Sequence, residues 1–403
     1  MSFIFKCKMR QSILVFSFII GTFSSLLQTS FAIAQWRFDQ SVQLIDAINR
    51  FENFVLDTMQ RRQLPGLAVA IVKGNQIVYL NGFGVKEFGS SDPIDIHTIF
   101  RLASVSKGFA SVLTGVLVDQ GALNWDDKVV KYLPNFRLYD AKNTQNLTIR
   151  HLLSHTTGLP QHTYTDLVEQ NLAFPEMVDR LSSVPLIAPV GKTYTYQNVI
   201  YSLIGDVVQA ATGKTYQELV TELIFEPLGM VDASLGKDGF LSSTNRALPH
   251  IQRNGGWITA PIKDAYYNVL PAAGVNASIY DMAQWLRAML GGAPHTISQQ
   301  TIQEVTTPWI RSPRERWKHR WREQVRDAHY GLGWRIYDYA GHKLVYHGGW
   351  IQGYRAEVGF MPDQKIGIAV LMNFESLVAI EFLPTFFDIY LNLTSSEEAG
   401  FAN

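Results

Sequence analysis

The chain is organised around residues 101–109, Arg-Leu-Ala-Ser-Val-Ser-Lys-Gly-Phe. Ser104 and Lys107 stand three positions apart, and residues at that spacing are neighbours on one face of a helix. Apolar, β-prone residues precede the pair at 98–102, and a helical pattern follows at 109–117. We therefore expect the pair at a strand-to-helix transition, where outward-pointing backbone N–H groups favour developing negative charge.

A serine beside a lysine suggests nucleophilic chemistry, but this spacing is a weak signal by itself. A serine hydroxyl becomes a strong nucleophile when a neighbouring base takes its proton. A lysine can be that base when its pKa is lowered or its proton is shared. A Ser-x-x-Lys match is expected about once by chance, and a second match occurs at Ser234 and Lys237. We assign the site to Ser104, predict a loop without fixed geometry at the second match, and interpret Ser106 as a packed or capping hydroxyl.

Length, composition and charge limit the classes of protein to which the chain could belong. The 403 residues are enough for one large domain or two ordinary ones. With 47% hydrophobic and 17% charged residues, the chain fits a globular protein with a sizeable core and not a disordered chain. The formal net charge is zero, so the composition gives no sign of nucleic-acid binding.

The N-terminal segment has the features of a secretion signal. Residues 1–10 contain basic side chains, residues 12–27 are apolar, and Ala32-Ile33-Ala34 supplies a small-x-small cleavage site. We predict that residues 1–34 are a signal peptide and that the mature protein is exported, periplasmic or secreted, with no stable membrane span after cleavage. A membrane anchor is the alternative, but the apolar stretch is shorter than the ~20 residues of a spanning helix. The only cysteine, Cys7, lies within the signal, so the mature chain would hold no disulfide.

Hydrophobic periodicity predicts strands at both ends of the mature chain and helices between them. After an amphipathic helix at 38–62, the first predicted strands are 67–72 and 77–80, joined by a two-residue turn. The last predicted strands are 331–337, 343–347, 354–360 and 366–372, followed by a helix at 377–391. The helical patterns between them include 199–211, 216–224 and 279–289.

This order predicts an α+β fold. An antiparallel sheet would be completed by both termini and flanked by helices, with an inserted, mostly helical domain. We divide the mature chain, residues 35–403, into an α/β part at 35–110 and 328–403 and a helical part at 111–327. A cleft is expected where the two parts meet, with Ser104 on that seam.

Two further segments carry residues suited to a site around Ser104. In Tyr196-Gln197-Asn198, a tyrosine can pass protons and an asparagine amide can orient a carbonyl. The alternative is a core tyrosine followed by a helix N-cap. In His347-Gly348-Gly349-Trp350, the glycines allow a ligand close to the backbone, and the last N–H, with that of Ser104, can form an oxyanion hole. The alternative there is a strand-ending glycine turn with an exposed histidine.

Taken in order, these three motifs resemble those of the serine β-lactamase and penicillin-binding protein superfamily, in particular its class C β-lactamase-related branch. The resemblance extends from about Phe51 to Asn373. It implies that Ser104 is the acylated nucleophile and that Lys107 and Tyr196 share the proton that leaves it. Asn198 would orient the carbonyl side.

The same resemblance gives roles to the third motif. His347, Gly348 and Gly349 would bind substrate, and the N–H groups of Ser104 and Trp350 would hold the oxyanion. His347 stands where class C β-lactamases usually carry the lysine of a Lys-Thr-Gly, and a histidine is mostly neutral near pH 7. It would hold a substrate carboxylate less firmly than a lysine. This departure is similar to the esterases, D-amino-acid peptidases and amide hydrolases of the branch.

The resemblance thus implies an exported serine hydrolase that acts through an acyl-enzyme without metal or cofactor. Its partner would be a small-molecule or peptide substrate: a small ester, an amide or a D-amino-acid peptide, with cell-wall peptides among the candidates. A class C β-lactamase or D,D-carboxypeptidase is the alternative within this class. A non-catalytic peptidoglycan- or penicillin-binding module is the alternative outside it.

Two other signals invite a functional interpretation. His155 follows a serine, but no Gly-x-Ser-x-Gly elbow exists in the chain, so we interpret it as tying down a loop. The basic run at 311–326 contains Trp317 and Trp321. We interpret it as a solvated insertion whose tryptophans pack on the domain; contact with an anionic surface is the alternative.

Overall fold

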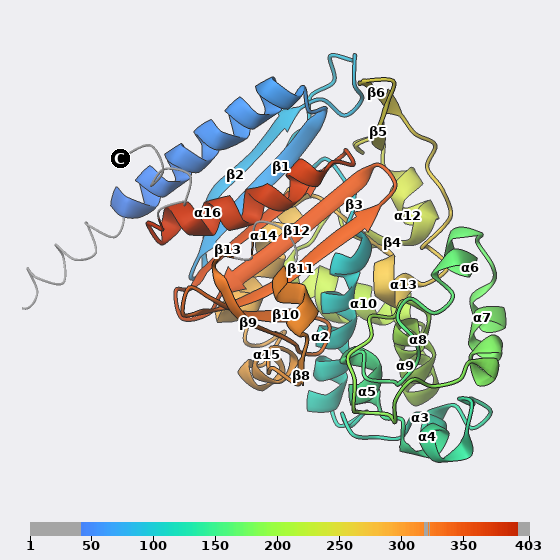
Figure 1. Cartoon of the computed structure of the whole chain (residues 1–403). Coiled ribbons are helices and arrows are strands. Elements are labelled where there is room, and N and C mark those ends of the chain that lie inside the picture. Colours follow the sequence, from blue (N-terminus) through green and yellow to red (C-terminus); the bar gives the residue numbers. More distant parts are fainter. Residues whose placement is uncertain (1–41, 318–320, 322, 394–403) are drawn as a thin grey trace, which may run out of the picture. The chain divides into compact units, whose positions relative to one another are not determined.

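The computed structural model describes residues 42–317, 321 and 323–393 (Figure 1). The signal peptide predicted for residues 1–34 lies outside the described residues, so it stays a prediction. Within the described part of the chain, no helix is long and apolar enough to cross a membrane.

The described residues form two compact units, one within residues 58–384 and one of the segments 42–57 and 385–393. In the described parts of the terminal unit, the rings of Phe51 and Phe386 pack edge to face with centroids 5.4 Å apart. The sheet and the candidate site lie within residues 58–384.

One antiparallel sheet of eight strands, in the order β2-β1-β13-β12-β11-β10-β9-β8, forms the larger unit's centre (Figure 1). Its strands are β1 (Gly66–Lys73), β2 (Gln76–Gly84), β8 (Ile310–Arg311), β9 (Val325–Tyr330), β10 (Arg335–Tyr339), β11 (His342–Ile351), β12 (Tyr354–Met361) and β13 (Ile366–Met372). β1 pairs with β13, so Val69 lies opposite Val370. Both strands are continuous apolar runs, as expected where a sheet is covered on both faces. The predicted α+β fold, with its sheet completed by both ends of the chain, is confirmed.

One predicted strand, 331–337, is wrong at its start. Residues 331–334 form the turn between β9 and β10, and Gly333 has φ of +75°, a conformation that glycine adopts without strain. A Cβ atom on Gly333 would lie 2.6 Å from the Lys107 carbonyl oxygen. Leu332 and Trp334 are fully buried, and their apolar character reflects packing in the core and not membership of a strand.

Helices fill the chain between β2 and β8 and close it after β13. They are η1 (Ala103–Val105), α2 (Ser106–Asp119), α3 (Val129–Tyr132), α4 (Ala141–Asn146), α5 (Ile149–Leu153), α6 (Thr165–Glu169), α7 (Phe174–Arg180), η2 (Leu181–Ser183), α8 (Val199–Ser202), α9 (Ile204–Thr212), α10 (Tyr216–Val220), η3 (Thr221–Phe225), α11 (Glu226–Leu228), α12 (Gly236–Ser242), α13 (Leu270–Ala273), α14 (Ile279–Arg287), η4 (Ala288–Gly292), α15 (Gln299–Val305), η5 (Pro313–Trp317), η7 (Leu377–Glu381) and α16 (Phe382–Tyr390). Two small sheets join β3 (Phe100–Arg101), β7 (Val275–Ala277) and β4 (Ser234–Leu235), and β5 (His250–Arg253) with β6 (Gly256–Thr259).

Helix α2 is the central element of the helical part. Its residues from Ser106 to Leu117 are all buried, which is typical of a helix enclosed on every side. Phe109 stacks on Trp285 of α14 at 4.0 Å between ring centroids. A Cβ on Gly108 would lie 2.6 Å from the Trp334 ring, so α2 also lies directly against the β9–β10 turn. This packing fixes the N-terminal end of α2 beside the sheet.

Candidate active site

Ser104 lies in the short turn that joins a strand to the central helix. β3 ends at Arg101, and Ser104 is the middle residue of η1, immediately before α2. Ala103 has φ of +46°, a left-handed conformation that costs a residue with a Cβ about 1–2 kcal/mol. The predicted strand-to-helix transition is therefore present, with a sharp turn at its centre. Ser104 is half-buried at the surface of a cavity.

Lys107 is fully buried beneath Ser104. Its Nζ lies 3.3 Å from the Ser104 Oγ, 2.8 Å from the Asn198 Oδ1 and 3.1 Å from the Ala272 carbonyl oxygen. Burial, and then the positive charge of Arg335, hold the pKa of Lys107 well below its usual value. A neutral amine has two N–H donors and one lone pair. It can donate to Asn198 and Ala272 while its lone pair accepts the Ser104 O–H, which is the geometry of a general base.

The segment with Tyr196 and Asn198 closes the site from the helical part. Asn198 begins α8 but makes no side-chain cap hydrogen bond, and its amide oxygen accepts from Lys107. The Tyr196 ring lies 4.6 Å from Lys107 Nζ, and its hydroxyl is hydrogen-bonded to Ser104. Burial raises the pKa of Tyr196 to about 12, although Arg335 and the hydrogen bond to Ser104 lower it. The site therefore favours a neutral lysine beside a neutral tyrosine over an ammonium–tyrosinate pair.

His155 holds this segment in place. It is fully buried, and its Nδ1 accepts a hydrogen bond from the Gln197 N–H at 3.2 Å, while its carbonyl accepts from the Thr195 N–H at 2.9 Å. Its ring lies 4.4 Å from that of Tyr196. Burial holds the pKa of His155 well below its usual value, so the ring is neutral. These contacts fit the interpretation that His155 ties down a loop.

Strand β11 passes very close to the Ser104 turn. A Cβ on Gly349 would lie 2.1 Å from the Leu102 carbonyl oxygen and 3.2 Å from the Ser104 backbone nitrogen. Only glycine permits this approach. Gly348 is also constrained, because its Cβ would lie 2.5 Å from the Tyr346 hydroxyl. The third predicted motif is thus brought to Ser104.

His347 occupies a different place from the one expected. It is fully buried and is absent from the cavity wall that contains Ser104. Its Nδ1 lies 2.9 Å from the Gly348 carbonyl oxygen, to which only an N–H can donate. Its Nε2 is then the acceptor, 3.2 Å from the Tyr330 hydroxyl and 3.3 Å from Arg335 Nη1. Both ring nitrogens are engaged inside the protein, so this geometry does not match direct binding of substrate by His347.

A cavity of about 580 Å³ opens beside Ser104. Its wall includes the predicted residues Tyr196, Asn198, Gly348, Gly349 and Trp350. It also includes five charged side chains to which the sequence analysis gave no role in the site: Glu169, Glu315, Arg335, Arg355 and Glu357. The two strand arginines break the apolar alternation of β10 and β12, which is a signal that sequence reasoning could have used.

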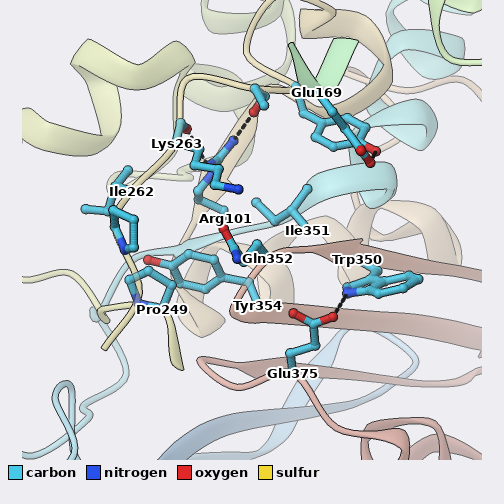
Figure 2. A pocket seen from close by; sticks show the side chains of 13 residues that line it. Arg101, Glu169, Pro249, Ile262, Lys263, Trp350, Ile351, Gln352, Tyr354 and Glu375 are labelled. Carbon is cyan, nitrogen blue, oxygen red and sulfur yellow. Dashed lines mark hydrogen bonds between the residues drawn. The ribbon is translucent and has the colours of Figure 1, made fainter. Parts of the chain in front are cut away.

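A second cavity of about 300 Å³ adjoins the first (Figure 2). Glu169, Tyr266 and Trp350 line both cavities. Figure 2 shows Arg101 at its centre, donating to the carbonyl oxygens of Lys263 and Ala265 at 3.0 and 3.1 Å. Space for a bound molecule therefore extends on both sides of the Trp350 side chain, which is 56% exposed.

The second Ser-x-x-Lys match does not form a comparable pair. Ser234 and Lys237 lie in β4 and α12, and not in the loop that the sequence predicted. The Ser234 hydroxyl accepts from the Asn276 amide at 3.3 Å, whereas Lys237 forms an ion pair with Asp264. Ser106 is buried, and its hydroxyl accepts from the Val275 N–H at 3.0 Å, as a packed hydroxyl should.

Two residues of the basic run at 311–326, Glu315 and Trp321, line the cavity beside Ser104. Trp321 is buried and packs on Tyr346 at 4.8 Å between ring centroids, as predicted for the tryptophans of this segment. The side chain of Trp317 lies outside the described residues. Glu315 is buried and bonded to Arg335, so the interpretation of the whole run as a solvated insertion is wrong at that residue.

The sheet with its helical insertion, and a serine, lysine and tyrosine at their junction, define a protein of the β-lactamase and penicillin-binding-protein class of serine hydrolases. The chain matches the family Beta-lactamase over residues 51–380 and belongs to it. The predicted superfamily is thereby confirmed.

Known relatives agree with this assignment. The chain is similar to the Unguisins hydrolase ungD of Aspergillus violaceofuscus, with 25% identity over 80% of this chain and 60% of that protein. It is also similar to Protein flp of Staphylococcus aureus, with 23% identity over 84% of this chain and 65% of that protein. The chain thus spans less than two thirds of the length of these relatives.

Solved structures show the same fold. The octameric penicillin-binding protein homologue from Pyrococcus abyssi matches with a TM-score of 0.76 and 25% identity, over 86% of this chain and 77% of that one. The penicillin-binding protein from Bacillus halodurans matches with a TM-score of 0.68 and 24% identity, over 82% of this chain and 97% of that one.

Proposed function

We propose that the protein is an exported serine hydrolase that works through an acyl-enzyme at Ser104. The observation that carries the proposal is the Lys107 amine, buried, 3.3 Å from the Ser104 hydroxyl and held by two oxygen acceptors that leave its lone pair for the serine proton. A module that only binds ligands would have no need of a buried lysine in this position. The non-catalytic alternative is therefore disfavoured.

The reaction would proceed in two halves. Lys107 takes the Ser104 proton as Oγ attacks the substrate carbonyl, and the N–H groups of Ser104 and Trp350 stabilise the oxyanion. Lys107 then returns that proton, with the Tyr196 hydroxyl as the relay, to the leaving group as the carbonyl–heteroatom bond breaks, so that both side chains end the step neutral. Water then attacks the acyl-enzyme by the same steps in reverse order, releasing the acid and restoring Ser104.

The substrates we propose are small esters, amides and D-amino-acid peptides. A relative called an unguisins hydrolase supports hydrolysis, although the sequence identity is only 25%. A class C β-lactamase or a D,D-carboxypeptidase stays the alternative. A panel of 4-nitrophenyl esters, D-Ala-D-Ala peptides and a cephalosporin separates these activities.

Labelling with a fluorophosphonate, followed by peptide mass spectrometry, tests the nucleophile. We expect the label on Ser104 and its loss in Ser104→Ala. Ser234→Ala is the matched control, because Ser234 belongs to the other Ser-x-x-Lys match, and it should be labelled like the wild type. A folded wild-type protein that remains unlabelled at Ser104 would refute the proposal.

Export is proposed from the sequence of residues 1–34. Expression of the full chain in a Gram-negative host, followed by N-terminal sequencing of the protein from each cell fraction, tests it. We expect a periplasmic product that begins at Gln35. A full-length product retained in the cytoplasm would contradict export.

A further inference from the structure

The inference concerns the size of the acyl group that the site accepts, and it rests on the proposed function. The cavity of about 580 Å³ beside Ser104 and the adjoining cavity of about 300 Å³ are separate spaces. Glu169, Tyr266 and Trp350 line both of them and therefore lie at their boundary. Ser104 lines the larger cavity and not the smaller one. A substrate that reacts at Ser104 reaches the smaller cavity only by passing this boundary.

The Trp350 ring forms the side of the boundary that belongs to the sheet. It follows Gly349 in β11, and 56% of the residue is exposed. Its Nε1 donates to Glu375 Oε1 at 3.0 Å (Figure 2), and the guanidinium carbon of Arg355 lies 4.4 Å from the ring centre. Glu375 is held in turn, because its Oε2 accepts from the Gly353 N–H at 3.3 Å. These contacts fix a bulky ring at the boundary without burying it in the core.

Glu169 and Tyr266 form the side of the boundary that belongs to the helical part. The Tyr266 hydroxyl donates to Glu169 Oε1 at 3.0 Å and so links α6 to the loop before α13. Burial, followed by the bond to Glu169, raises the pKa of Tyr266, so its hydroxyl stays a donor. Tyr266 has φ of +70°, a conformation that costs free energy for a residue with a Cβ. The boundary is thus held by hydrogen bonds on both sides.

The acyl group is the part of a substrate that would extend toward Trp350. Tyr196, which relays the proton to the leaving group in the proposed reaction, lines the larger cavity and not the smaller one. The leaving group would therefore occupy the larger cavity. Because the N–H groups of Ser104 and Trp350 would hold the oxyanion, the scissile carbonyl would lie close to Trp350. Of the two groups on the carbonyl carbon, the acyl group is the one left to approach the Trp350 ring.

Behind the boundary, the smaller cavity could hold a hydrocarbon chain. The Arg101 guanidinium in this cavity is engaged by two carbonyl oxygens and by the Tyr267 ring at 3.8 Å. Each methylene that moves from water into an apolar site is worth a factor of about four in binding. A ring that closes this space therefore denies a long acyl chain a substantial gain in affinity. The apolar side chains of the cavity wall come from Pro249, Pro261, Ile262, Ala265, Ile351 and Tyr354.

We propose that Trp350 is a specificity-determining residue that limits the acyl group to a short chain by closing the larger cavity toward the smaller one. The preferred substrates would then be esters and amides of short acids, such as acetyl and butyryl derivatives. The selection works through a clash with long chains and not through a new attraction to short ones. Removal of the ring would join the two spaces and admit longer acyl groups.

The 4-nitrophenyl esters of acetate, butyrate, hexanoate and octanoate test the proposal. In the wild type, kcat/KM should fall from butyrate to octanoate. In Trp350→Ala, the ratio of kcat/KM for octanoate to that for butyrate should rise about ten- to hundredfold, within the limit of about a factor of four for each of the added methylenes. The ratio is taken within one protein, so an effect on the oxyanion hole cancels. A wild type that prefers octanoate, or a ratio unchanged in Trp350→Ala, overturns the proposal.

Two variants complete the test. Trp309→Ala is the matched control, because Trp309 is also exposed and lies 4.0 Å from the guanidinium carbon of Arg150, but lines neither cavity. It should keep the wild-type ratio. Tyr266→Gly removes the other side of the boundary with a residue that suits a φ of +70°, so it should raise the ratio even if Trp350→Ala fails to fold. A ratio that rises equally in Trp309→Ala, or in neither boundary variant, overturns the proposal.

The leaving group provides an internal control. The ratio of kcat/KM for 2-naphthyl acetate to that for phenyl acetate varies the size of the leaving group alone. This ratio should be the same in wild type and Trp350→Ala, because the leaving group would lie in the larger cavity. A change confined to this ratio overturns the assignment of Trp350 to the acyl side.

Binding separates this inference from the proposed function. The variant Ser104→Ala forms no acyl-enzyme, so calorimetry can compare 4-nitrophenyl hexanoate and 4-nitrophenyl butyrate as ligands, with and without Trp350→Ala. A gain in affinity for the hexanoate relative to the butyrate on removing the ring supports the inference even if the wild type hydrolyses neither ester. Equal relative affinities in the two proteins refute it even if hydrolysis is observed.

Discussion

Replacing Lys107 by methionine should change how the stability of the protein depends on pH. Lys107 is fully buried, and burial, followed by Arg335, holds its pKa well below the ordinary value of 10.5. Methionine has a similar length and no charge. The variant therefore removes one titrating group and perturbs the packing little.

The size of the effect follows from proton counting. Between the lowered pKa of the folded state and the value of 10.5 in the unfolded state, native Lys107 is neutral whereas unfolded Lys107 binds a proton. The unfolded state then binds one more proton, so the free energy of unfolding rises by about 1.4 kcal/mol per pH unit. As the pH falls through this window that stability is lost, and below the folded pKa the dependence ends. The difference between wild type and variant isolates this contribution.

Urea denaturation measures this contribution of Lys107 to the free energy of unfolding. Wild type, Lys107→Met and the exposed control Lys142→Met are compared from about pH 6 to about pH 9.5 at constant ionic strength. The free energy of unfolding of the wild type, minus that of Lys107→Met, should rise by about 1.4 kcal/mol per pH unit once the folded lysine is neutral, whereas Lys142→Met should parallel the wild type. A gap that stays constant over the whole range would show that Lys107 is protonated in the folded protein. It could then not serve as the base for Ser104.

Three further predictions test neighbouring residues. Burial raises the pKa of Glu357 from 4.5 to about 7, so its stabilising effect is complete below pH 4.5 and is lost as the pH rises through 7; the stability gap between wild type and Glu357→Gln should shrink by about 3 kcal/mol over that range in urea denaturation. Gly349→Ala places a methyl group 2.1 Å from the Leu102 carbonyl oxygen, and should slow fluorophosphonate labelling at least ~100-fold, whereas Gly256→Ala, which meets no atom within 4 Å, should not. Tyr196→Phe keeps the ring and removes the hydroxyl, and should lower kcat/KM for esters about 10²- to 10⁴-fold without unfolding the protein, as circular dichroism would show.

The sheet could be predicted because its strands are decided by local patterns. A short stretch of sequence is enough to predict the apolar runs of β1 and β13 and the turn between β1 and β2. The strand predicted at 331–337 failed because its first four residues, Gly-Leu-Gly-Trp, are apolar for a different reason. They pack against α2, and this contact depends on residues more than 200 positions earlier in the chain.

Part of the candidate site could likewise be predicted from local sequence, and part could not. Ser104 and Lys107 could be paired from the sequence, because three-residue spacing on a helical turn brings side chains together wherever the helix lies. Glu315 and Arg335 could not be paired, because one comes from η5 and the other from β10, and only the packing of that turn on the sheet joins them. The resemblance selects His347 from the sequence, but its contacts with Tyr330 and Arg335 could not be predicted, because neither of those residues belongs to a motif.

The charge of Arg335 bears on the strength of the base. Its charge is one of the causes that lower the pKa of Lys107. A substrate carboxylate bound to Arg335 would offset that charge and raise the pKa of Lys107 in the complex. Since Lys107 must be neutral to act, kcat for an anionic ester should begin to fall at a higher pH on the acid side than kcat for its neutral partner.

The pH profiles of kcat for 4-nitrophenyl hemisuccinate, an anionic ester, and 4-nitrophenyl butyrate, its neutral counterpart, check this coupling. In the wild type the acid limb of the anionic ester should lie to the alkaline side of the other, and in Arg335→Met the two limbs should coincide. Coincident limbs in the wild type, together with a strong preference for the anionic ester, would mean that the carboxylate is bound too far from Lys107 to affect it. The anion would then be bound away from Arg335, on the side of the adjoining cavity, whose wall includes the cations Arg101 and Lys263 (Figure 2).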